Sequence, residues 1–512
     1  MEDTQKRGWV TKALDVIERV GNKLPHPATL FAILAGLIIV VSGIMAAIGV
    51  TVEDPIKGET VTVFNLMSSE GIQYIFENFV TNFTGFAPLG TVLVTMLGIG
   101  VAERSGLISA MLRGLVTSVP SSMITAALVF AGIMSSMAAD AGYVVLVPLG
   151  AVLYAGLGRH PLAGLAAAFA GVSAGFSANL SLTALDPLLA DLTIEAVKNS
   201  AFPEYAGQIQ YTMNYFFMLA SVVLLTVVGT WVTNRFVEPR LGNYQGEVEE
   251  EINYLTKAEK KGLILSFLSL LVTLGLLSLL IAFEWSPLRN NEDVLMSPFF
   301  FNLVPSIFLA FFIPGLVYGI VTKNIKNDKD VANQLNETME TMGSFIVLSF
   351  FAAQFVGFFA KTNLGRILAI KGAEFLDSTG INDFRVVILF IIVASLINLV
   401  MGSASAKWAI MAPVFVPIMM RIGYSPEFTT LIYRIADSTT NVISPLMTYF
   451  AIVIAFAQKY DKRVGIGTLI STMLPYSIAF FIAWLIMLII WVVVGLPIGP
   501  DTGIYFDGDM WK

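Results

Sequence analysis

The sequence contains no cysteine and only two histidines among its 512 residues. Disulfide frameworks, thiolate nucleophiles and metal cages of histidine and cysteine are therefore excluded or nearly so. Charged residues are also scarce, at 13%, where an average soluble domain carries about 25%. The net charge of −7 lies mostly in loops and at both ends, and there is no basic stripe of the kind that neutralises phosphates, so nucleic acid is not an expected partner.

Motifs for enzymatic chemistry are missing as well. The phosphate-binding pattern G-x-x-x-x-G-K-[ST] does not occur, so nothing suggests that the protein hydrolyses ATP. Neither a nucleophile with a neighbouring base nor a set of metal ligands is apparent, and we expect no enzyme and no cofactor. An ion gradient, of protons or of sodium, is the default energy source.

Apolar residues are abundant, at 56%, and they recur in runs separated by short polar stretches. Because a bilayer core takes about 20 apolar residues as a helix, these runs predict an all-α polytopic membrane protein with about nine spans. The membrane domain covers 27–497, after an N-terminal segment at 1–26 and before a tail at 498–512. The predicted spans are roughly 27–50, 122–158, 161–190, 212–236, 262–283, 299–321, 385–423, 428–457 and 466–497. Several of these exceed 30 residues and contain Gly, Pro and polar clusters, which predicts breaks in their middle.

Lysine and arginine in the short loops orient the spans. The loops sort into a basic side, which includes the N-terminus and which the positive-inside rule assigns to the cytoplasm, and a side poor in Lys and Arg. The second side holds 51–84, 191–211 and 284–298. Two further apolar stretches, 85–118 and 339–373, must enter and leave on one side for this map to hold, and we interpret them as re-entrant hairpins. Two full crossings in each stretch fit the map equally well.

Prolines point to an internal repeat. Pro148 and Pro161 are separated by the same interval as Pro413 and Pro426, and Tyr143 then corresponds to Trp408.

We place repeat one at about 85–190 and repeat two at about 339–457. By the charge map, the first copy begins outside and the second inside, so the pattern is an inverted repeat, which many secondary transporters use to alternate access. Chance similarity among apolar segments is the alternative.

Few charges lie within the spans, and each costs at least a few kcal/mol there, so each needs a role. They are Asp140, Asp186, Lys407, Arg434 and Asp437. Arg434 and Asp437 have the spacing of an ion pair on one helix face. Either they form a self-neutralising structural pair, or Arg434 binds a substrate carboxylate while Asp437 alternates between a proton and a salt bridge.

Asp186 has no cationic neighbour in the sequence, and Pro187 frees a backbone carbonyl beside it. We predict a protonatable or cation-binding carboxylate there. Asn179 and Asn441, with their hydroxyl neighbours, offer oxygen ligands to a hard cation, and together with Asp437 they are candidate sodium ligands. They could equally bind substrate, or simply form hydrogen bonds between helices.

Trp408 could stack on an aromatic substrate or belong to the aromatic belt at the membrane interface. The polar steps at 103–106 and 361–363 are the expected tips of the two hairpins.

Four segments resemble the p-aminobenzoyl-glutamate transporter family (AbgT), and the likeness extends over essentially the full length. They read SANL at 177–180, LDPLL at 185–189, SASAKW at 403–408 and RIADSTTN at 434–441. The resemblance implies a homodimer of subunits with nine spans and two hairpins, within a superfamily of ion-coupled carboxylate transporters. Members import p-aminobenzoyl-glutamate or export sulfonamide antimetabolites by proton antiport.

Carried over by motif, the resemblance implies functional roles for residues in both repeats. Combined with the analysis above, ion coupling is predicted at Asp186 and Asp437, and substrate binding at Ser405, Trp408, Arg434, Asn179, Asn441 and Pro445. The expected location is the bacterial inner membrane. A sodium-coupled importer of another dicarboxylate and a channel remain alternatives.

Overall fold

Helices form nearly all of the regular structure of the computed structural model, which describes residues 25, 27–54, 58–137, 142–242, 244, 254–292, 294, 297–379, 384–445, 447 and 449–506. The α-helices are α2 Pro27–Ile48, α3 Ser69–Thr84, α4 Ala87–Arg104, α5 Leu107–Thr117, α6 Ile124–Met134, α7 Val147–Gly156, α8 Pro161–Phe169, α9 Leu185–Lys198, α10 Tyr215–Val232, α11 Glu238–Leu241, α12 Lys257–Ala282, α13 Pro298–Phe301, α14 Val304–Thr322, α15 Asp328–Thr341, α16 Gly343–Lys361, α17 Leu364–Thr379, α18 Phe384–Val400, α19 Ala404–Arg421, α20 Pro426–Asn441, α21 Phe450–Gln458 and α22 Ile466–Val494.

Short 3-10 or π turns interrupt or extend several helices. They are η1 Ser121–Met123, η2 Ser135–Met137, η3 Gly142–Leu146, η4 Ala170–Ala174, η5 Pro203–Gln208 and η6 Thr233–Val237. The strands β1 Thr51–Asp54 and β2 Glu59–Thr62 form an antiparallel hairpin that the sequence analysis did not predict.

In the described part of the chain, seven helices are long and apolar enough to cross a membrane, or up to eight if α5 and α6, bent by 115° at 118–120, count as one broken span. The all-α polytopic class is thereby confirmed. Five of these helices match predicted spans, whereas Ser69–Arg104 covers part of a predicted exterior loop and of the first predicted hairpin, and Gly343–Lys361 lies in the second. The other four predicted spans are segments that the structure builds from shorter helices. The segment 122–158 contains α6 and α7, and 385–423 contains α18 and α19.

Serine hydroxyls form hydrogen bonds with backbone groups where these shorter helices end or begin. The hydroxyls of Ser135 and Ser136 donate to the carbonyl oxygens of Gly132 and Ile133 at the end of α6 (2.6 and 2.7 Å). At the start of α19, the amide of Ala406 donates to Ser403 Oγ, which caps the helix (3.3 Å). A hydroxyl can thus replace the hydrogen bond that a continuing helix would have supplied.

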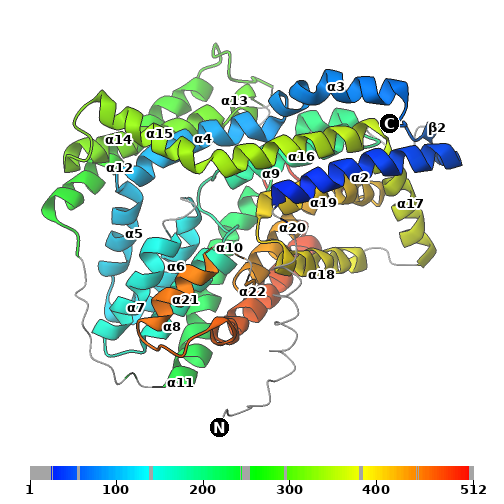
Figure 1. Cartoon of the computed structure of the whole chain (residues 1–512). Helices are drawn as coiled ribbons and strands as arrows, with labels where there is room; N and C mark the ends of the chain where they lie inside the picture. Colours follow the sequence, from blue (N-terminus) through cyan, green and yellow to red (C-terminus); the bar gives the residue numbers. More distant parts are fainter. Residues whose placement is uncertain are drawn as a thin grey trace, which may run out of the picture.

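The two halves of the chain are packed crosswise. Helix α2 packs against α16 of the second half, while α14 packs against α4 of the first half, and Figure 1 shows α2 running beside α16 in the upper part of the molecule. The short helices α3 and α15 follow the same rule, since α3 contacts α16 and α15 contacts α4. Each half therefore supplies the outer helix that covers the other half.

Both predicted hairpin tips coincide with helix ends, and each is held by the other half. Gly106 follows α4 with φ of 89°, a left-handed conformation that glycine adopts without strain, and Asn324 Nδ2 donates to the carbonyl oxygen of Ser105 (2.8 Å). After α16, Asn363 Nδ2 donates to the carbonyl oxygen of Thr62 (3.0 Å). Re-entry of these segments on one side of a membrane stays a prediction.

Helix α6 and the π turn η4 approach each other backbone to backbone. A Cβ atom on Gly171 would collide with the carbonyl oxygen of Val129 and lie 2.9 Å from Cα of Gly132. Since both collisions involve backbone atoms, no side chain can move aside to relieve them. This close contact brings the first repeat's interrupted helices together.

We expect Gly171→Ala to lower the free energy of unfolding by about 1 to 3 kcal/mol, the usual cost of overpacking. Thermal unfolding in detergent would measure it. Gly36→Ala on α2 is the matched control, because a Cβ atom there meets nothing within 4 Å. An equal loss of stability in both variants would contradict the close-contact explanation.

Candidate functional site

The interrupted helices of the two repeats meet inside the molecule. The Ser136 hydroxyl, at the break after α6, lies 2.7 Å from the side-chain amide of Asn179 in the break before α9. The amide of Ser177 in that second break donates to Ser438 Oγ on α20 (3.2 Å). The broken segments of repeat one are thus bonded to each other and to the polar helix of repeat two.

Arg434 and Asp186 form a buried ion pair at this junction. Arg434 Nη1 on α20 lies 2.8 Å from Asp186 Oδ1 on α9, and the two side chains are only 2% and 8% exposed. Arg434 Nη2 also donates to the carbonyl oxygen of Ser177 (3.0 Å), while Asp186 Oδ2 accepts from the amide and hydroxyl of Thr183 (2.7 and 3.0 Å). Arg434 Nε has no hydrogen-bond partner within the described residues.

A second buried ion pair lies one turn further along α20. Lys407 Nζ contacts both Asp437 Oδ1 and Asn398 Oδ1, and the side chains of the pair are almost fully buried. Asn398 Nδ2 faces the carbonyl oxygen of Asp437, Thr440 Oγ1 and Asn441 Oδ1 (2.6, 2.7 and 2.9 Å). Helices α18, α19 and α20 are therefore joined through one amide and one ammonium.

The structural pairing of Arg434 with Asp437, one of the two alternatives that the sequence left open, is not observed. Each residue has a different partner from another helix, and the shared spacing on α20 only places them on neighbouring faces. Asp186, which the sequence leaves without a cation, receives Arg434 from the other repeat. A charged group on a packed neighbouring helix can point directly at its partner. Side chains at i and i+3 of one helix must instead both turn along the helix surface to meet.

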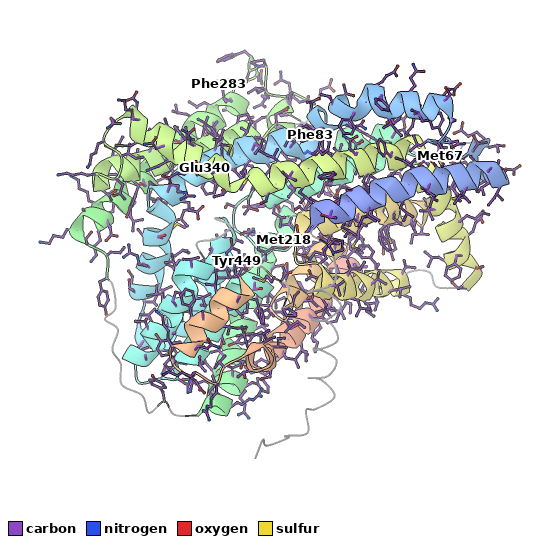
Figure 2. All side chains as sticks on the ribbon, in the orientation of Figure 1. Met67, Phe83, Met218, Phe283, Glu340 and Tyr449 are labelled. Carbon is purple, nitrogen blue, oxygen red and sulfur yellow. The ribbon has the colours of Figure 1, made fainter. Side chains whose placement is uncertain are left out.

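Two aromatic pairs flank the junction. Trp408 is fully buried, stacks on Tyr433 (ring centroids 4.5 Å apart, 27° between planes) and donates through Nε1 to Thr193 Oγ1 (3.0 Å). Tyr143, its predicted counterpart, stacks on Tyr449 (4.5 Å, 8°), which stands just before α21 in Figure 2. In this conformation Trp408 presents no free face, and its role in substrate binding stays a prediction.

The remaining predicted site residues lie at or near the same breaks. Ser405 is in the first turn of α19, where its hydroxyl is 3.3 Å from that of Ser403, and Pro445 is in the turn between α20 and α21. Asn179 keeps its Nδ2 without a partner among the described residues, which leaves a donor at the junction. Asp140 lies outside the described residues.

Asn398 is the site residue that the sequence analysis missed. It contacts Lys407, the backbone of Asp437 and the side chain of Asn441, yet it was not selected because it lies within an apolar run of α18. The available signal was a lone amide at the centre of a predicted span, where a polar group needs a partner. Lys407 was noted as an intramembrane charge but was not given a site role.

These contacts predict strong coupling within each ion pair. Replacing one member, as in Lys407→Met or Asp186→Asn, leaves a buried charge unpaired, and breaking such a pair costs about 3 to 5 kcal/mol. Double-mutant cycles on thermal or denaturant unfolding should therefore give large coupling energies for Lys407 with Asp437 and for Arg434 with Asp186. The cycle of Arg434 with Asp437 is the control and should be closer to additive; a larger coupling there would contradict the assigned partners.

Comparison with known proteins identifies the family. The model described as the "AbgT putative transporter family" matches residues 12–506. The p-aminobenzoyl-glutamate transport protein of Escherichia coli is 38% identical over 500 residues, which is 97% of this chain and 96% of that protein. Two solved structures superpose closely: the YdaH transporter of Alcanivorax borkumensis, with an unusual topology (TM-score 0.88, 42% identity, 93% of this chain and 100% of that chain), and Neisseria gonorrhoeae MtrF, from a class of antimetabolite efflux pumps (TM-score 0.89, 46% identity, 96% and 100%). The chain therefore belongs to the AbgT transporter family and is a polytopic membrane transporter of small molecules.

Proposed function

We propose that the chain couples the proton gradient to transport of p-aminobenzoyl-glutamate, to export of sulfonamide antimetabolites, or to both. The substrates come from the Escherichia coli relative's name, from the efflux class of the MtrF structure and from the family resemblance. A sodium-coupled importer of another dicarboxylate is the second candidate.

The observation that carries the proposal is the pair of buried ion pairs where the interrupted helices meet. Charges are kept at such depth only when they have partners or a function, since each costs several kcal/mol to bury. Here Arg434 and Asp186 come from different repeats, so relative movement of the repeats must make or break their contact. Sparse paired charges at broken helices suit a gated carrier better than a channel, which needs a continuous row of pore-lining groups.

Arg434 is the proposed receptor for a substrate carboxylate. Its guanidinium holds Asp186 through one terminal nitrogen, and its Nε is unpartnered among the described residues. A substrate carboxylate can compete with Asp186 for this fork, because guanidinium binds carboxylates in a bidentate manner. The displaced Asp186 then takes up a proton, since an isolated carboxylate is costly at this depth. Substrate binding and protonation would thus be linked at one contact.

Lys407 supports a proton as the coupling ion. Its ammonium lies among the oxygens of Asp437 and Asn398, where a free cation would otherwise bind. Both members of this pair can gain or lose a proton. The sodium candidate would use Asp437 with Asn441 and, from the other repeat, Asn179. Of these, only Asn441 lies beside Asp437, with its Nδ2 3.4 Å from Asp437 Oδ2, while Asn179 contacts Ser136 instead.

We also propose the assembly and the membrane. The chain would function as a homodimer in the bacterial inner membrane with its N-terminus in the cytoplasm. The family resemblance supports the dimer, and the distribution of Lys and Arg among the loops supports the orientation.

Asp186→Asn should abolish proton-coupled transport in proteoliposomes, because the change preserves volume and removes the titratable group; since it also lowers stability, only protein that elutes as a folded dimer would be reconstituted. Uptake of labelled p-aminobenzoyl-glutamate would be measured under imposed proton and sodium gradients. Wild-type dependence on the proton gradient in this variant would refute the coupling role, and dependence of the unmodified protein on sodium alone would favour the second candidate.

Arg434→Ala should weaken binding of p-aminobenzoyl-glutamate more than binding of sulfonamides, which have no carboxylate. Binding titrations of both ligands would test this. Trp408→Phe is the companion variant: it keeps a ring against Tyr433 but loses the bond to Thr193, and it should affect both ligands alike because they share the p-aminophenyl group. Equal losses for both ligands in the arginine variant would contradict carboxylate recognition.

A further inference from the structure

Besides Asp186, helix α9 carries a second buried aspartate, which lies outside the junction described above. Asp191 is 4% exposed and lies in the middle of the helix, five residues after Asp186. Within the described residues, no cation lies at salt-bridge distance from it. Burying an unpaired carboxylate costs much more free energy than burying the neutral acid. The surroundings of Asp191 therefore decide which form it takes.

The neighbours of Asp191 fit a protonated carboxyl group. Tyr211 donates its hydroxyl to Asp191 Oδ1 (3.1 Å), while Oδ2 has no hydrogen-bond partner in the described part of the chain. The Thr91 hydroxyl of α4 also faces this carboxyl group, but it donates its own proton to the carbonyl oxygen of Ala87 (3.0 Å). Because no group donates to Oδ2, nothing in the described surroundings stabilises a negative charge on that oxygen, and a proton there gives the neutral form that burial favours.

Other charges act on Asp191 only from a distance. Lys198, at the end of the same helix, is the cation that influences it, and the ammonium of Lys198 lies 3.9 Å from Glu195. Three groups therefore act on Asp191. They are Tyr211 from the α9–α10 connection, Thr91 from α4 and, at a distance, Lys198 from α9 itself.

The position of Asp191 connects the junction to one side of the membrane. Helix α9 begins at the Arg434–Asp186 pair, and its second half, from Asp191 onward, lies in the segment 191–211 that the positive-inside rule assigns to the exterior. A small cavity lies beside the outer half of this helix; it is lined by Leu192, Glu195, Asn199 and Arg366, among others, and not by Asp191 itself. Five residues of helix rise about 7.5 Å and turn through about 140°, so the two aspartates leave α9 on different faces and a proton passing between them needs a chain of several waters.

We propose that Asp191 is a proton-holding site that relays protons between the outer solution and Asp186. In the transfer, Asp191 Oδ2–H gives its proton through a chain of waters to the Asp186 carboxylate, after substrate has displaced that carboxylate from Arg434. Asp191 is left ionised and regains a proton from outer water. The relay rests on the proton coupling proposed above, but the protonation of Asp191 can be measured without transport.

Infrared spectroscopy tests the protonation directly. At mildly acidic pH, the difference between the purified wild-type protein and Asp191→Asn should contain the carbonyl stretching band of one protonated carboxyl group, shifted in heavy water. The variant is nearly isosteric, and its elution as a folded dimer would be checked first; Asp191→Glu should restore a protonated-carboxyl band. Absence of the band from the wild-type difference would overturn the proposal.

Transport in proteoliposomes tests the relay. With inner pH fixed and outer pH varied, Asp191→Asn should lose the dependence on outer pH and slow proton-driven transport by about tenfold or more, while substrate binding is retained. Asp191→Glu should recover part of the rate.

Glu427→Gln is the matched control. Glu427 is likewise buried, and its carboxyl group accepts from a tyrosine, Tyr205 (3.2 and 3.3 Å), but it lies in the first turn of α20 and not on α9. We expect unchanged dependence on outer pH.

The outcomes separate the two proposals. A proton-driven wild-type protein with an unchanged Asp191→Asn variant would overturn the relay and leave the coupling at Asp186 standing. If Glu427→Gln, and not Asp191→Asn, removes the outer-pH dependence, protons pass along α20 and the assignment to Asp191 is wrong. A wild-type protein that transports regardless of the proton gradient would overturn the proton coupling itself and the relay with it.

Discussion

The contact between Arg434 and Asp186 is the interaction on which the interior depends. It joins α20 of the second repeat to α9 of the first at a depth where neither charge could remain alone. The breaks in the helices follow from the same requirement, since an uninterrupted helix has no free backbone groups to offer. The freed carbonyl oxygen of Ser177 accepts from Arg434, and the freed amide of Thr183 donates to Asp186.

Helix α20 combines almost complete burial with a polar sequence. Its arginine faces α9 and its aspartate faces α19, so two neighbours are held by opposite charges on one helix. Asn398 adds α18 to this arrangement through an amide that both donates and accepts. Such satisfied polar networks fix a register between helices that apolar packing in a membrane would leave loosely defined.

Local chemistry in the sequence predicted the helical class, the breaks and the identity of the buried charges. Serine, glycine and proline end helices for reasons contained within a few residues, and an intramembrane charge is conspicuous wherever it pairs. The partners could not be predicted, because Arg434 and Asp186 are 248 residues apart. The near spacing of Arg434 and Asp437 suggested a pair that tertiary packing replaced. The stacking of Trp408 on Tyr433 likewise depends on how α19 and α20 meet.

The crossed packing of α2 on α16 and of α14 on α4 has a consequence for biosynthesis. When the first half has been inserted, α4 still lacks the surface that α14 will cover, and α2 has nothing to rest on until α16 has been made. The order of translation therefore imposes a waiting period on the nascent protein, during which lipid must occupy surfaces destined for later helices. Neither half is a complete folding unit, and a chain divided between them would yield two fragments that reach their native packing only by assembling with each other.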